Sequence, residues 1–234
     1  VKIDGSNLGS ALAGTIAATR LSANTTSGFS IVKFTGNLTS GATIAHGLSE
    51  APEFVLLKTL DIARNWIDNV PGSTWSYYMH LSVSDAQTSD TGLFNGTAPS
   101  ASVVTLGSYA SANDDEGMIA YCFHSVEGYS KVGSYEGNGN ADGTFIYTGF
   151  SPKFFLSKNI DNTQNWTIQG YAPGYNPEDR KIFPNEPDVE GTGSNLDFLS
   201  NGVKWRVNYN EGNGSYTYLY MAFAESPFKT SNAR

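Results

Sequence analysis

The chain repeats itself at a spacing of about 100 residues, and this duplication constrains the fold more than any other feature. Gly28-Phe29-Ser30 returns as Gly128-Tyr129-Ser130. Other matched pairs at nearly the same offset are Val32 and Val132, Pro52 and Pro152, Phe54 and Phe154, Leu56 and Leu156, Lys58 and Lys158, Asn65-Trp66 and Asn165-Trp166, Asn113 and Asn213, and Phe123 and Phe223. The repeat predicts two related modules at residues 28–127 and 128–234, after an N-terminal connector at 1–27.

The middles of the modules, about 67–100 and 167–200, keep their length but little identity. This is the pattern expected when a scaffold is duplicated and its exposed loops then diverge, and binding residues concentrate on such loops. We therefore expect any specific function to lie in these two stretches.

Short β-favouring runs, separated by turn residues, make up both modules. Aromatic residues are 13% of the chain, and several of its 25 glycines stand in Asn-Gly, Asp-Gly or Gly-Asn steps that favour tight turns. The expected strands are 29–35, 42–45, 53–59, 76–83, 103–107 and 118–125, then 129–135, 144–147, 153–158, 166–169, 202–209 and 216–225. The predicted fold is all-β, with two tandem, homologous antiparallel β-sandwich modules of the jelly-roll type.

Charge and hydropathy exclude several classes of partner. The net charge is −8 and Lys and Arg form no cluster, whereas affinity for nucleic acid depends on clustered cations. No apolar stretch approaches the roughly 20 residues that a membrane-spanning helix needs. We therefore expect neither nucleic acid nor membrane insertion, and we interpret the single cysteine, Cys122, as a small buried hydrophobe.

The titratable residues do not form a recognisable catalytic or metal-binding motif. His46, His80 and His124 lack the spacing of metal ligands, and no Gly-x-Ser-x-Gly element is present. The segment 136–143 alternates oxygen-bearing side chains with glycine but lacks the acids that open and close a calcium loop, so a hairpin loop is the simpler interpretation. The sequence predicts no catalytic residue, no metal site and no cofactor.

The tryptophans and tyrosines divide into two groups. Trp66 and Trp166 occupy equivalent positions in the two modules, which favours a role as packing anchors. The divergent middles carry instead Trp75, Tyr77, Tyr78, Tyr171 and Tyr175, and exposed aromatic rings of this kind can stack on sugars. These five residues are the candidate contacts to a ligand surface, and the alternative is that they complete the modules or bury at a subunit interface.

Three segments carry a family resemblance: Gly-Phe-Ser-Ile-Val-Lys-Phe-Thr-Gly-Asn at 28–37, Ala-Tyr-Cys-Phe-His-Ser-Val-Glu-Gly-Tyr-Ser-Lys-Val-Gly-Ser-Tyr at 120–135, and Leu-Tyr-Met-Ala-Phe-Ala-Glu-Ser-Pro-Phe-Lys at 219–229. Together they resemble a domain of unknown function found in tail-fibre and other virion structural proteins of marine bacteriophages. The resemblance implies a place on the exterior of the particle, other virion proteins as partners and a homotrimer. It brings no assigned catalytic or ligand residues.

The function expected from these features is that of a noncatalytic tail-fibre or spike segment that adheres to a glycan or protein of the host cell surface. One alternative is a capsid or tail decoration protein with a purely structural role. Another is a glycan depolymerase that uses paired carboxylates, for which the loop acids Asp85, Asp90, Asp188 and Glu190 are the candidates.

Overall fold

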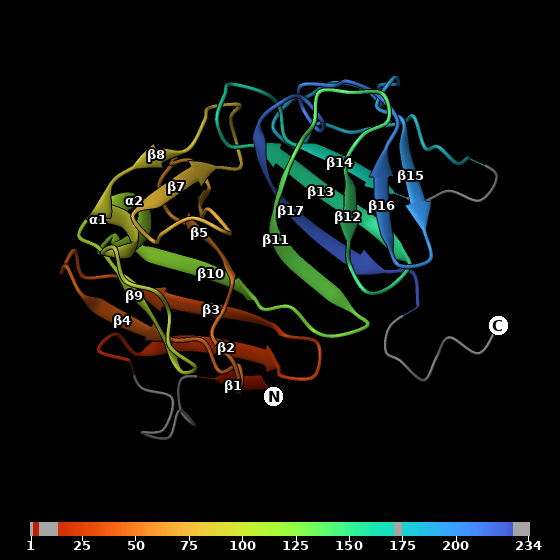
Figure 1. Ribbon diagram of the computed structural model, residues 1–234. Helices are drawn as coiled ribbons and strands as arrows, with labels where there is room; N and C mark the ends of the chain where they lie inside the picture. Colours follow the sequence, from red (N-terminus) through yellow and green to blue (C-terminus); the bar gives the residue numbers. More distant parts are fainter. Residues whose placement is uncertain (1, 5–13, 171–174, 227–234) are drawn as a thin grey trace. The chain divides into compact units, whose positions relative to one another are not determined.

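The computed structural model describes residues 2–4, 14–170 and 175–226, and the side chains from residue 14 onwards. The chain is all-β, and every pair of neighbouring strands within its sheets is antiparallel (Figure 1). It forms two compact units: unit one comprises Val1–His80 and Gln87–His124, and unit two comprises Leu81–Ala86 and Ser125–Arg234.

Unit one contains an eight-stranded sheet in the order β1-β2-β3-β10-β5-β6-β7-β8 and a two-stranded sheet of β4 and β9 (Figure 1). The strands are β1 Lys2–Asp4, β2 Ala18–Asn24, β3 Phe29–Thr35, β4 Ala42–Ala45, β5 Phe54–Thr59, β6 Ile67–Asn69, β7 Tyr77–His80, β8 Thr88–Ser89, β9 Val103–Leu106 and β10 Gly117–Phe123. Two helices of four residues each, α1 Thr91–Phe94 and α2 Ala110–Asn113, lie in the described part of this unit.

Unit two contains a four-stranded sheet in the order β11-β17-β13-β14 and a three-stranded sheet in the order β12-β16-β15 (Figure 1). The strands are β11 Ser130–Glu136, β12 Phe145–Tyr147, β13 Pro152–Asn159, β14 Thr167–Gly170, β15 Leu196–Leu199, β16 Gly202–Trp205 and β17 Thr217–Ala224. The order β11-β17-β13-β14 repeats the order β3-β10-β5-β6 of unit one, strand for equivalent strand.

Alternation of apolar and polar residues explains which face of each strand is buried. In β3, Val32 and Phe34 are fully buried, whereas Lys33 and Thr35 between and beside them are exposed. The apolar core of unit one draws residues from both of its sheets, including Val32 and Leu57 from the larger and Ile44 and Val104 from the smaller. The core of unit two is built in the same way but from larger rings, among them Tyr135, Phe155, Trp205 and Tyr218.

A buried asparagine occupies the same place in both units and explains part of the repeat. Asn113 accepts a hydrogen bond from the backbone N–H of Asn37 at 2.9 Å and donates to the carbonyls of Gly107 at 2.9 Å and Thr39 at 3.1 Å. Asn213 donates in the same way to the carbonyls of Val207 at 3.0 Å and Asn140 at 2.8 Å. Because buried backbone groups need partners, each asparagine holds together loops that have no ladder of their own.

The structure differs from the sequence expectations at the N-terminus. Residues 18–24 fall in the stretch predicted to be a connector, yet they form β2, which pairs with β3 along its whole length. Ala18, Leu21 and Ala23 point into the core of unit one, so this segment is part of the sheet. Strands β1, β6, β8 and β15 and both short helices were not predicted either.

Candidate functional site

The aromatic residues singled out as candidate contacts belong to both units, with Trp75, Tyr77 and Tyr78 in unit one. Trp75 lies edge-on to Phe94 with ring centroids 5.4 Å apart, and both Trp75 and Tyr78 pack against the core of unit one. Tyr77 is half-buried on β7. Tyr171 lies outside the residues that the structure describes. The geometry of Trp75 and Tyr78 therefore fits the packing alternative.

Tyr175 has a different environment, in unit two, where its side chain is 54% exposed. The Arg180 guanidinium lies over its ring, 4.3 Å from the centroid. Arg180 is itself fixed by the buried Glu178 carboxylate through two hydrogen bonds of 2.7 and 2.8 Å, which raise the pKa of Arg180 above its usual value. Tyr175 is thus an exposed ring held in place by a charged side chain, as a contact residue needs to be.

Trp66 and Trp166, which occupy equivalent positions in the two modules, differ in burial. Trp166 is fully buried in unit two, whereas Trp66 is half-buried and lies 6.0 Å from the Tyr121 ring. Both rings pack against protein, in line with their predicted role as anchors.

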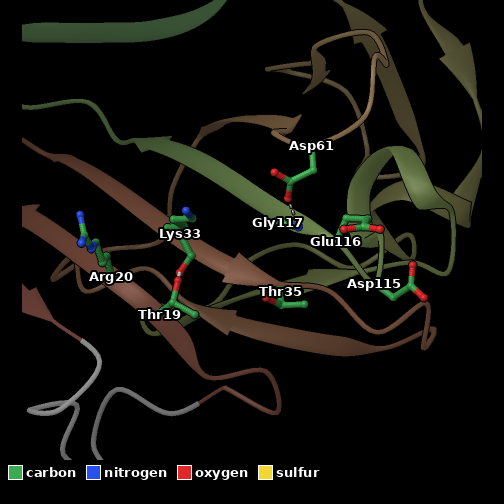
Figure 2. Close-up of a pocket in the computed structure, with 8 residues that line it drawn as sticks. All are labelled: Thr19, Arg20, Lys33, Thr35, Asp61, Asp115, Glu116 and Gly117. Carbon is green, nitrogen blue, oxygen red and sulfur yellow. Dashed lines mark hydrogen bonds between the residues drawn. The ribbon is translucent and has the colours of Figure 1, made fainter.

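Unit one carries an open groove of about 530 Å³ that sequence reasoning did not identify. Figure 2 shows its lining, which comes from β2, β3, the start of β10 and the turns beside β5 and β10. The lining residues, which define what we call the unit-one groove, are Thr19, Arg20, Lys33, Thr35, Asp61, Asp115, Glu116 and Gly117. Its volume is within the range of about 300–1,000 Å³ that is typical of small-molecule sites.

Two cations form one end of the unit-one groove. Arg20 and Lys33 are direct cross-strand partners on β2 and β3, and both are exposed. A β-bulge between Ala18 and Arg20 lets the consecutive residues Thr19 and Arg20 both face solvent. Among the side chains that the structure describes, which begin at residue 14, neither cation forms an ion pair within 4.0 Å. Arg20 has Asp4 of β1 as its other cross-strand partner in the register. Like charges placed opposite one another destabilise a sheet, so the pairing of Arg20 with Lys33 does not itself stabilise the fold.

Acids form the other end of the groove (Figure 2). Asp61 accepts a hydrogen bond from the backbone N–H of Gly117 at 2.9 Å, and Asp115 and Glu116 are exposed just before β10. A Cβ atom on residue 117 would lie 2.5 Å from the Asp61 carboxylate, so glycine leaves room for that side chain. The groove is therefore bipolar, with cations on the β2–β3 side and carboxylates on the β10 side.

Comparing the groove residues with their equivalents in unit two shows which of them belong to the duplicated scaffold and which occur in unit one alone. Asp161, the equivalent of Asp61, accepts from the backbone N–H of Thr217 at 2.7 Å, so this carboxylate cap belongs to the duplicated scaffold. Ser134 pairs with Leu219 as Lys33 pairs with Ile119, so a serine stands where unit one has a lysine. Within residues 125–170 and 175–226, the larger sheet of unit two ends at β11 and contains no counterpart of β2. Both cations are therefore additions specific to unit one.

Cys122 and His46, two side chains that could act as a nucleophile or a base, are both buried. Burial raises the pKa of the Cys122 thiol to about 12 and keeps it protonated. Burial lowers the pKa of His46, whose Nδ1 accepts from the backbone N–H of Leu48 at 3.2 Å while Nε2 lies 3.1 Å from the Ser100 carbonyl oxygen. These contacts describe a neutral imidazole that ties two loops together.

The acids considered for a depolymerase belong to both units, with Asp90 in unit one and Asp85, Asp188 and Glu190 in unit two. Asp90 caps α1 by accepting from the backbone N–H of Gly92 at 2.8 Å. Glu190 lies 3.7 Å from Arg180 in unit two, and Asp85 and Asp188 are exposed. Among the described side chains, no group of three or more His, Cys, Asp or Glu residues has an arrangement that could hold a metal ion.

The segment 136–143 forms a hairpin loop whose oxygens are used locally. Asn138 Oδ1 accepts from the backbone N–H of Asn140 at 3.0 Å, and Asn140 Oδ1 accepts from that of Asp142 at 2.9 Å. The Asp142 carboxylate lies 2.8 Å from Lys204 Nζ, and this hydrogen bond lowers the pKa of Asp142. No described helix has the length and apolar character needed to span a membrane.

Comparison with known proteins identifies one family. Residues 4–227 match the family described as "Domain of unknown function (DUF7483)", so the match includes parts of both units. No curated protein and no solved structure matches the chain. Because the matched segment is far more than half of the 234 residues, the chain belongs to the family of domain of unknown function DUF7483.

Proposed function

We propose that this chain is a noncatalytic segment of a bacteriophage tail fibre or spike that adheres to the surface of the host cell. The observation that carries the proposal is the unit-one groove, whose two cations were added to a duplicated scaffold that folds without them in unit two. Residues that a fold does not need are candidates for binding. The virion assignment draws on the family resemblance carried by residues 28–37, 120–135 and 219–229.

The proposed architecture is a pair of tandem β-sandwiches of the jelly-roll type. A larger and a smaller sheet contribute to one core in each unit, and the equivalent strands follow the same order in the larger sheets. Antiparallel sandwiches of this kind present loops and outer faces on a rigid framework. The segment would lie on the exterior of the particle, as a homotrimer in contact with other virion proteins.

The unit-one groove and Tyr175 supply the contacts in this proposal, while Trp75 and Tyr78 stabilise unit one. Tyr175 offers an exposed ring for stacking on a sugar, and the groove offers charged and hydroxyl groups for its polar substituents. The ligand is a glycan of the bacterial envelope rather than a buried cofactor, because the groove is open and all its side chains reach solvent.

The test measures binding and sugar release together. The purified chain is incubated with a panel of marine bacteria and with polysaccharide extracted from each strain, and bound protein and reducing sugar are quantified. Saturable binding without sugar release is the expected result. Release of reducing sugar would assign a glycan depolymerase, and absence of binding to every strain would favour a decoration protein that only builds the particle.

A further inference from the structure

We propose that the unit-one groove binds a saccharide in which an acidic sugar alternates with a neutral one, with Arg20 and Lys33 holding the carboxylate. The inference rests on the proposed attachment function and names its ligand class. It starts from the placement of two cations side by side in a chain that has 14 Lys and Arg residues and a net charge of −8.

The cation end is suited to a single carboxylate. A guanidinium recognises a carboxylate through two parallel hydrogen bonds, and a neighbouring ammonium adds a point charge. The Arg20 and Lys33 side chains project from adjacent strands of one sheet face, so both can reach one anionic group (Figure 2). Thr19 stands beside them and is oriented by a hydrogen bond from its hydroxyl to the Lys33 carbonyl at 3.1 Å.

The acid end determines what the rest of the ligand must be. Asp115 and Glu116 repel a second negative charge, so a densely charged polyanion does not fit along the groove. Carboxylates accept hydrogen bonds from hydroxyl groups, which a neutral sugar has in abundance. A ligand with one carboxylate at one end and hydroxyls at the other therefore matches both ends.

An acidic segment of another protein is the competing occupant, and the same charge argument disfavours it. Consecutive carboxylates of an acidic peptide would place negative charge next to Asp115 and Glu116. The floor of the groove, formed by Gly117 and Thr35, carries no large apolar side chain that a peptide could bury against.

The experiment uses the full chain and defined probes in calorimetric titrations. A hyaluronan hexasaccharide, with alternating acidic and neutral sugars, is compared with neutral chitohexaose, densely sulfated heparin hexasaccharide and hexaglutamate. The groove variant is R20Q/K33Q. The control variant K131Q/K153Q removes two cations from unit two and matches the change in net charge.

We expect the wild-type chain and the control to bind hyaluronan best. Loss of charge-assisted hydrogen bonds in R20Q/K33Q should raise the Kd by about 10- to 100-fold. Equal binding of hyaluronan by R20Q/K33Q and wild type, or tighter binding of chitohexaose, heparin or hexaglutamate, overturns the inference. Circular dichroism establishes that each variant is folded.

A parallel measurement with bacterial cells separates the two proposals. If wild type and R20Q/K33Q attach to cells equally well, the attachment function stands and the groove is not its ligand site. If no form attaches to cells but hyaluronan binding still depends on Arg20 and Lys33, the ligand class stands and the attachment function fails.

Discussion

Replacing Asn113 by alanine tests how the duplicated scaffold is held together. The side chain is fully buried and bonds to three backbone groups: the N–H of Asn37 and the carbonyls of Gly107 and Thr39. The Thr39 carbonyl also accepts from the backbone N–H of Ala42 at 3.2 Å. Leaving a buried polar group without a partner costs roughly 1–3 kcal/mol. Gly107 is buried, whereas Asn37 and Thr39 are exposed. We therefore take about 2 kcal/mol for the Gly107 carbonyl and about 0.5 kcal/mol for each of the other two hydrogen bonds, and expect N113A to lower the free energy of unfolding by about 3 kcal/mol.

Urea denaturation followed by tryptophan fluorescence measures this loss, and hydrogen–deuterium exchange locates it. Loss of protection should be confined to unit one, because the partners of Asn113 all belong to that unit. The matched control is N201A, because Asn201 is exposed in the turn between β15 and β16. A surface change of this kind alters the free energy of unfolding by less than about 0.5 kcal/mol. An N113A chain as stable as N201A would refute the reasoning.

Three further predictions concern packing, contact residues and pH. The G212A substitution would place a Cβ atom 2.1 Å from the buried Trp205 ring, and we expect it to lower the unfolding free energy by about 1–3 kcal/mol in urea titrations. The control G170A should leave the unfolding free energy unchanged, because the nearest atom to its Cβ would lie 3.5 Å away. The W75A substitution should lower the melting temperature because Trp75 packs on Phe94, whereas Y175A should leave it unchanged and weaken attachment to cells. The pKa of His46 is lowered on folding, so its contribution to stability is present above the unfolded pKa near 6.5 and is lost as pH falls. The urea midpoint should therefore drop between pH 7 and 5 by more in wild type than in H46Q.

Each of these predictions has a clear contrary result. Equal stability of G212A and G170A would mean that the Trp205 ring can move aside. An unchanged melting temperature in W75A would return Trp75 to the set of contact residues. A pH profile of H46Q that is identical to wild type would assign the acid sensitivity to other groups.

Strands with regular alternation were predicted well from the sequence. The expected runs 29–35 and 42–45 coincide with β3 and β4, because each alternates or clusters apolar residues between clear turn signals. The segment that forms β2 was not predicted as a strand, because its inward residues Ala18, Leu21 and Ala23 are mostly small and lie in a stretch rich in Ala, Ser and Thr. Only pairing with β3 shows that these positions face a core.

The candidate site depended on information that sequence patterns do not carry. Arg20 and Lys33 are 13 positions apart, and the register that brings them together depends on a β-bulge beside Ala18. The burial of Trp75 is likewise a tertiary effect, because it requires Phe94 from α1. Tyr175 lies in a divergent loop, where the sequence predicted function, and its exposure is consistent with that prediction.

The most direct test of the account is attachment of fluorescently labelled chains to a panel of marine bacteria, measured by flow cytometry. The forms compared are wild type, R20Q/K33Q and the charge-matched K131Q/K153Q. The account predicts saturable attachment of wild type and the control to at least one strain, with attachment of R20Q/K33Q reduced at least about tenfold. Equal attachment of all three forms would contradict the assignment of the unit-one groove as the contact site, and attachment of none would contradict the attachment function.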